Sequence, residues 1–150
     1  MKKIYTLLFA SLFCFNIAAL AQPNCIIVTD PRLLTRLTNL YPDCFAGHPG
    51  FMDTTCNDIV TATSLNIGGG GSGNGIQQMY PIQYFDSLKY LDCSGNSLST
   101  IVCPSQLETL NCSGQVASWL INFRCLHDLG PLPATLRVLD CSSNAIGSLP

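Results

Sequence analysis

The chain has 150 residues, of which 47% are hydrophobic and 11% are charged, and its formal net charge at pH 7 is −2. This mild acidity argues against a nucleic-acid partner, because nucleic-acid binding requires clustered Lys and Arg side chains. The high apolar fraction does not imply a membrane domain, because no stretch after residue 21 approaches the ~20 apolar residues that span a bilayer.

The first 21 residues have the features of a secretory signal peptide. Two lysines precede an apolar run, and the small residues Ala19 and Ala21 suit a cleavage site. An N-terminal membrane anchor is the weaker reading, because Asn16 interrupts the run. We therefore expect a cleaved signal peptide over residues 1–21, a mature chain with a formal charge of −4 after loss of two lysines, and a secreted or cell-surface protein without a transmembrane segment.

Residues 22–63 show no repeat and are expected to form an N-terminal cap. Asp30 followed by Pro31 is typical of a helix start, because the Asp side chain accepts from the first N–H groups and Pro has no N–H to lose. Leucines at positions 33, 34, 37 and 40 fall on one face. The pattern predicts an amphipathic helix over 31–40 that covers the edge of the first repeat strand.

Three of the eight cysteines that follow the signal peptide lie in this cap, and disulfides are permitted in an exported chain. Cys44 with Cys56 is the preferred bridge, and Cys25 could compete for either partner.

The next segment predicts a degenerate strand near 64–67, with Leu65 and Ile67 pointing inward, and then a Gly-rich loop over 68–75. The loop has a glycine spacing similar to nucleotide-binding motifs. It lacks the Lys-Ser/Thr of a phosphate-binding loop and the helix that should follow, so a flexible loop is favoured.

The phrase Leu-x-x-Leu-x-Cys-Ser recurs at 88–94, 107–113 and 136–142. Alternate residues of a strand point to opposite faces, so the second Leu and the Cys share the inward face. The phrases therefore predict strands near 90–93, 109–112 and 138–141. Asn96 and Asn144 follow where the backbone turns and needs partners. The predicted repeat core comprises Leu88, Leu91, Cys93, Asn96, Leu107, Leu110, Cys112, Leu136, Leu139, Cys141 and Asn144. Gln115 stands where the first and third repeats have Asn96 and Asn144, so the second repeat is expected to turn differently.

The strand cysteines are 19 and then 29 residues apart, so the second repeat carries an insertion, placed over 116–128. Cys103 and Cys125 could meet on the convex side and tether it. The strand cysteines themselves are interpreted as buried thiols, because a line of ligands along stacked strands does not close a tetrahedron around zinc. No metal or cofactor is expected.

The repeated phrase resembles the leucine-rich repeat pattern. Together with residues 28–34 and 59–67, it is similar to the cap and opening repeats of secreted bacterial proteins of the internalin-like kind. The last unit is also similar to the proline-containing repeats of bacterial effectors, some of which carry a ubiquitin ligase domain. The resemblance implies an α/β repeat solenoid over 64–150, with a curved parallel sheet on its concave face and a helical N-terminal cap. The sequence stops within a repeat without a polar cap, so we expect a fragment.

A repeat array of this class binds rather than catalyses, so we expect no enzyme activity in this segment and a protein or glycan partner. The outward strand positions are polar with one exposed Tyr, which suits reversible recognition. The predicted binding residues are Tyr90, Asp92, Ser94, Thr109, Asn111, Ser113, Val138, Asp140 and Ser142. Trp119 and Phe123 form a second candidate patch, or pack the insertion onto the convex side. The alternatives are the substrate-targeting repeats of a longer enzyme, such as a ubiquitin ligase-type effector or a surface hydrolase, and a structural adhesion protein.

Overall fold

The structure is a computed structural model that describes residues 24–69, 75–118, 123–124 and 126–147. The expected signal peptide lies outside these residues. With η for a short 3₁₀ helix, the elements in chain order are β1 (Cys25–Ile27), α1 (Pro31–Leu40), η2 (Pro42–Phe45), β2 (Phe51–Asp53), α2 (Asn57–Val60), β3 (Ser64–Asn66), η3 (Tyr80–Tyr84), β4 (Tyr90–Asp92), β5 (Thr109–Asn111), β6 (Val116–Ser118), β7 (Phe123–Arg124) and β8 (Val138–Asp140).

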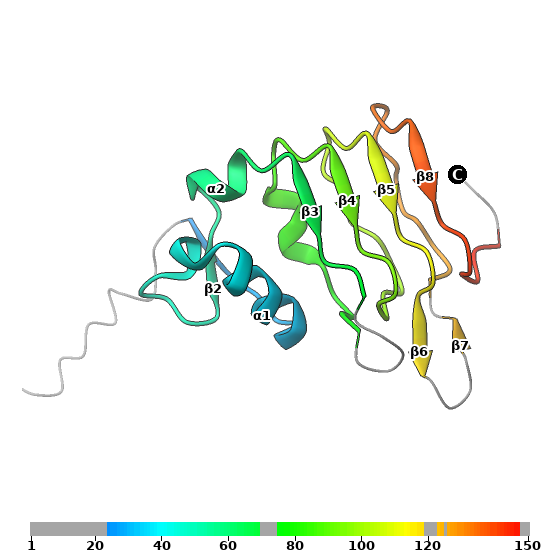
Figure 1. Cartoon of the computed structure of the whole chain (residues 1–150), viewed down its shortest axis with the longest axis horizontal. Helices are drawn as coiled ribbons and strands as arrows, with labels where there is room; N and C mark the ends of the chain where they lie inside the picture. The colour runs from blue at the N-terminus through cyan, green and yellow to red at the C-terminus, as the bar shows by residue number, and fades with distance from the viewer. Residues whose placement is uncertain (1–23, 70–74, 119–122, 125, 148–150) are drawn as a thin grey trace, which may run out of the picture.

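Four short strands, β3, β4, β5 and β8, form a parallel sheet in that order (Figure 1). Each strand begins where its sequence phrase placed it and ends one residue before the expected boundary. In the register, the central leucine of each strand lies opposite the central leucine of the next. This alignment follows from the repeated phrase, because a shift of one residue would turn every leucine to solvent.

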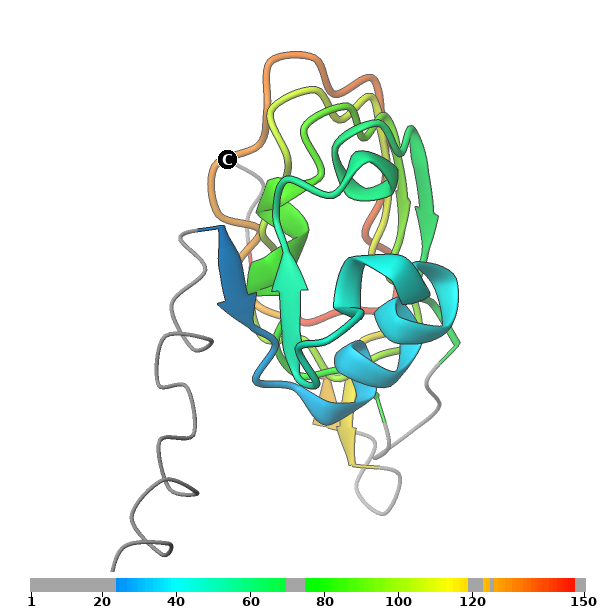
Figure 2. The same ribbon diagram turned by 90° about the vertical axis from the view of Figure 1, so that its left-hand side faces the viewer.

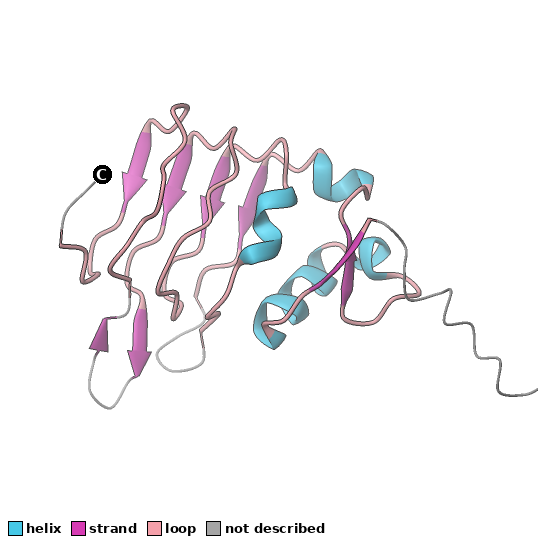
Figure 3. Ribbon diagram, turned by 180° about the vertical axis from the view of Figure 1, so that it is seen from behind, coloured by secondary structure: helices cyan, strands magenta, loops and turns pink. Residues whose placement is uncertain are grey.

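The inward side chains of the first strands are fully buried. Leu91, Cys93, Leu110 and Cys112 have no solvent exposure, and Leu65 has 1%. Their opposite wall includes η3, which lies behind the sheet in Figure 1 and in front of it in Figure 3. The buried residues of cap, sheet and η3 form one hydrophobic core.

The last described repeat is less well covered. Leu136, Leu139 and Cys141 are only partly buried, whereas their counterparts on β4 and β5 have no exposure. The reason is that β8 is the outer strand of the described sheet, so its inward side chains have neighbours on one side only.

The cap lies at the β3 end of the sheet (Figures 1 and 2). Helix α1 buries Leu33 and Leu37 but leaves Leu40 50% exposed. Its last leucine therefore does not contribute to covering the core. Strands β1 and β2 pair antiparallel beside it. The sequence does not predict this pair, because three-residue strands are too short to show alternation.

The segment 116–128 contains a second antiparallel pair, β6 with β7, beyond the carboxyl end of β5 in Figure 1. Thr100 also forms an isolated parallel bridge with Asp128. Among the helices of the described residues, none is both long and apolar enough to span a bilayer.

Candidate binding face

The face of the four-stranded sheet that points away from the core carries the outward positions of the repeats. We call it the sheet face. Tyr90 and Val138, at the first position of their strands, are 40% and 56% exposed, and Thr109 between them is half-buried. The sheet face comprises Ser64, Tyr90, Thr109 and Val138, then Asn66, Asp92, Asn111 and Asp140, then Ser94, Ser113 and Ser142 in the following turns.

In each strand of the four-stranded sheet, the side chain of the third residue hydrogen-bonds the turn that follows. The Oδ1 atoms of Asn66, Asp92, Asn111 and Asp140 each accept from the backbone N–H two residues later, at 3.0, 3.0, 3.2 and 3.0 Å. The hydroxyls of Ser94 and Ser113 donate to the same oxygens at 2.7 and 2.8 Å. The Ser142 backbone N–H, and then its hydroxyl, lower the pKa of Asp140. These side chains therefore stabilise turns as well as facing solvent.

The turn bonds also fix what each side chain offers to a partner. Because the turn N–H groups use Oδ1, Asn66 and Asn111 keep their Nδ2 donors for a partner, and Asp92 and Asp140 keep their second carboxylate oxygen. Across the strand order the sheet face thus presents donor, acceptor, donor, acceptor.

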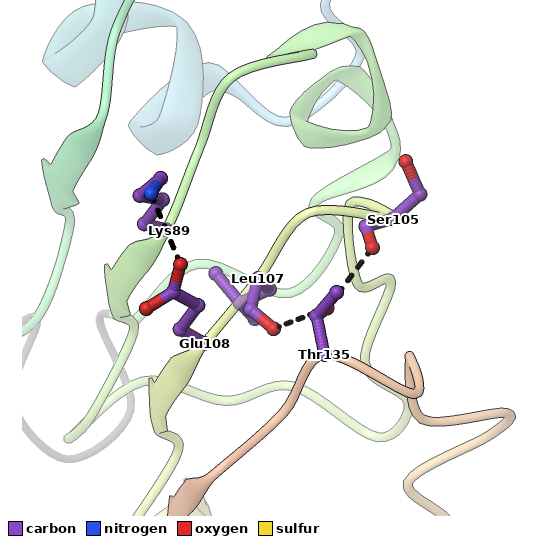
Figure 4. A network of polar contacts seen from close by, with 5 residues as sticks. All are labelled: Lys89, Ser105, Leu107, Glu108 and Thr135. Atoms are coloured by element: carbon purple, nitrogen blue, oxygen red, sulfur yellow. Dashed lines mark hydrogen bonds and ion pairs between the residues drawn. The ribbon is translucent and has the colours of Figure 1, made fainter.

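A row of charged residues precedes the strands. Lys89 Nζ lies 3.1 Å from Glu108 Oε1, and their side chains are 60% and 41% exposed (Figure 4). Such an exposed pair contributes only about 0–1 kcal/mol to stability. Nearby, the Thr135 hydroxyl donates to the Leu107 and Ser105 carbonyls, which ties the third phrase to the second.

A buried amide ladder runs along the other end of the strands. The Nδ2 of Asn96 donates to the carbonyls of Ile67 and Cys93. Gln115 Nε2 donates to Cys93 and Cys112, and Asn144 Nδ2 donates to Cys112 and Cys141. The Cys93 and Cys112 carbonyls, one residue beyond β4 and β5, therefore each accept from two successive ladder residues, which joins the repeats.

The expectation that Gln115 makes the second repeat turn differently is wrong. Gln115 is fully buried in the same ladder, and the residue before it is Gly114 with φ 67°, close to Gly95 with φ 63°. The glutamine keeps the terminal amide that the turn needs. Its extra methylene lets Oε1 reach the Leu98 N–H at 3.0 Å, two residues beyond Asn96 in the preceding repeat.

Among the described residues, the cysteines form one disulfide and a group of thiols. Cys44 and Cys56, the pair favoured by the sequence, are bridged with a Cα–Cα distance of 5.4 Å, whereas Cys25 lies on β1. Cys93, Cys103, Cys112 and Cys141 are free thiols. Because Cys103 is a free thiol, the structure does not bear out its expected bridge with Cys125, which itself lies outside the described residues.

Burial makes the thiols of Cys93, Cys103 and Cys112 weak nucleophiles and metal ligands, since the thiolate is the reactive form. It raises the pKa of Cys112 to about 12 and of Cys103 to about 11, and raises that of Cys93 well above its ordinary value. In the part of the chain that the structure describes, no group of three or more His, Cys, Asp or Glu side chains could hold a metal ion.

The second candidate patch is not placed by the structure. Trp119 lies outside the described residues, and of Phe123 only the backbone on β7 is described.

Comparison with known families gives one match. The family model for Leucine Rich Repeat matches residues 87–110, from the turn before β4 into β5. No curated protein and no solved structure matches the chain. Repeats of this class typically form binding surfaces. The match at 87–110 and the parallel sheet of in-register repeat strands support a leucine-rich repeat protein, and the motif suggests a protein–protein interaction module.

Proposed function

We propose that this chain is a secreted or cell-surface binding module that contacts a protein partner through its sheet face. The observation that carries the proposal is the contrast between the two faces. The inner face is buried in the core at β3, β4 and β5, whereas the outer face exposes Tyr90 and Val138 and carries Asn66, Asp92, Asn111 and Asp140 on adjacent strands.

The hydrogen bonds of the turns support a recognition role. Asp92 and Asn111 each accept two hydrogen bonds at Oδ1, one from a backbone N–H and one from a serine hydroxyl. Their orientation is therefore set before a partner arrives. Less side-chain entropy is then lost on binding, which is the usual advantage of a preorganised surface.

The localisation is part of the proposal. A signal-like N-terminus and a disulfide between Cys44 and Cys56 suit an oxidising compartment. The internalin-like resemblance of the cap and opening repeats favours a bacterial surface protein whose solenoid recognises host or neighbour surface molecules.

The test compares a sheet-face variant with a matched control. Tyr90→Ser with Val138→Ser removes the two exposed apolar side chains at positions that hold no turn. Tyr80→Ser is the control, because Tyr80 is 54% exposed on η3, on the far side of the sheet. The immobilised chains are measured against panels of purified surface proteins and of glycans.

We expect a protein ligand whose affinity falls roughly tenfold or more in the double variant and is unchanged in the control. Ligands that bind both variants equally would reject the sheet face. If the only ligands found are glycans, the sheet face remains the proposed binding site and the partner is a glycan instead of a protein, because Asn and Asp side chains also hydrogen-bond hydroxyl groups.

A further inference from the structure

The sheet face has a pattern that is complementary to itself. Its third-position residues run Asn66, Asp92, Asn111, Asp140 across β3, β4, β5 and β8, and the side-chain atoms that the turn N–H groups do not use alternate between amide donors and carboxylate acceptors. A two-fold axis that is parallel to the strands and lies between β4 and β5 reverses this order. It places Asn66 opposite Asp140, and Asp92 opposite Asn111, of another copy.

The charged residues Lys89 and Glu108, which precede β4 and β5, are related by the same two-fold axis. The Lys89 and Glu108 backbones are aligned on neighbouring strands, because the Glu108 N–H donates to the Lys89 carbonyl at 2.8 Å. The two-fold axis therefore sets Lys89 opposite Glu108 of the other copy, and the reverse. The third-position row and the two central residues of the charged row thus become complementary under one axis, as an isologous interface requires.

We propose that the sheet face binds a second copy of this chain, face to face, about this axis. Four amide-to-carboxylate hydrogen bonds and two Lys–Glu pairs then cross the interface, with Tyr90 against Thr109 and Ser64 against Val138. Sheets that pack face to face keep their strands roughly aligned, as the axis demands. The inference rests on the proposed function, because it uses the same face, and it names one partner.

The decisive variant is Asn111→Asp. Aspartate can accept the Ser113 N–H as asparagine does, and Asp140 fills the same position on β8, so the turn is kept. In the dimer the new carboxylate lies opposite Asp92 at two symmetric places, and like charges in register repel. Asp92→Asn added to Asn111→Asp restores one amide and one carboxylate at each contact. This double variant is the matched control.

The measurement is sedimentation velocity of the purified chain over a concentration series. We expect a concentration-dependent dimer for the unsubstituted chain, a dimer weakened roughly tenfold or more by Asn111→Asp, and recovery in the double variant. A second pair of variants controls for misfolding. Lys89→Glu should weaken the dimer, and Lys89→Glu with Glu108→Lys should restore it.

A monomer at every concentration, or a dimer that neither single substitution weakens, overturns the inference. If that monomer still binds an unrelated protein through Tyr90 and Val138, the proposed function survives alone. If the dimer forms as expected and no other ligand depends on the face, the second copy is its partner.

Discussion

At the scale of single residues, buried amides connect one repeat to the next. The Cys93 carbonyl accepts from Asn96 at 2.9 Å and from Gln115 at 2.8 Å. Gln115 also supplies the only acceptor that the structure gives, within its described residues, to the buried Leu98 N–H. The sequence pattern predicts a break at this glutamine, because the phrase shows residue types and not the atoms that the turn requires.

Replacing Gln115 by Leu removes three hydrogen bonds and orphans the Leu98 N–H. An unsatisfied buried group of this kind costs about 1–3 kcal/mol, so we expect urea unfolding to show a loss of roughly 3 kcal/mol in the free energy of unfolding. Gln115→Asn keeps the amide and is the control, with an expected loss of about 1 kcal/mol. Equal losses in the two variants would mean that packing rather than the ladder fixes this position.

Gly75, at the end of the Gly-rich segment, is a glycine that packing demands. A Cβ built there would lie 2.6 Å from the Asn96 backbone, which has no flexible end to move aside. Gly75→Ala should therefore lower the thermal midpoint, with a loss of about 3 kcal/mol from overpacking. Gly147→Ala is the control, because nothing lies within 4 Å of its added Cβ. A Gly75→Ala chain as stable as the control would show that the two backbones can separate freely.

At the scale of elements, the turn after each strand needs a left-handed residue. Gly95 and Gly114 supply it with φ 63° and 67°, but the last described turn uses Ser143 with φ 59°. A residue with a Cβ is disfavoured there by about 1–2 kcal/mol, and glycine loses part of that advantage through its greater unfolded-state entropy.

Ser143→Gly should therefore raise the free energy of unfolding by about 0.5–1 kcal/mol. The reverse change, Gly114→Ser, should lower it by about 1 kcal/mol, since the space around Gly114 is open and only the backbone conformation is strained. Both are measured by urea unfolding. A destabilised Ser143→Gly chain would indicate that the serine side chain holds the turn.

The parts of the fold that the sequence predicted are those with a local pattern. The phrases at 88–94 and 107–113 each place a leucine two residues before the cysteine, so the alternation of a strand alone locates β4 and β5. The pairs β1 with β2 and β6 with β7 have no such signal. The donor and acceptor order of the sheet face was also hidden, because it depends on which atom of each side chain the turn consumes.

At the scale of the whole molecule, one carboxylate joins the cap to the repeats. Asp30 Oδ1 accepts from the Arg32 and Leu33 N–H groups at the start of α1, as its place before Pro31 predicts. Its Oδ2 accepts from Gln77 and Gln78 at 2.7 and 3.1 Å. Those partners are 47 and 48 residues away, beyond the Gly-rich loop, and no local pattern could reveal them.

Asp30→Asn should destabilise the cap and the repeats together, because an amide nitrogen would face one pair of N–H donors. Hydrogen bonds to a charged group contribute about 1.5–3 kcal/mol each, so we expect a loss of roughly 3 kcal/mol at pH 7. Asp86→Asn, in the exposed turn before β4, is the control for loss of one carboxylate.

The pH dependence of that loss tests the role of the charge. Burial alone would raise the pKa of Asp30, but the N–H groups of Gln77, Leu33, Gln78 and Arg32 outweigh it and lower the pKa below the ordinary 3.8. A lowered folded-state pKa means that the stabilisation is complete above the unfolded value and is lost as the pH falls through the folded one. The difference between the unsubstituted chain and Asp30→Asn in urea unfolding should therefore be constant from neutral pH down to about pH 5 and shrink below about pH 4. A difference that stays the same down to pH 2 would show that the position needs an oxygen of the right shape and not its charge.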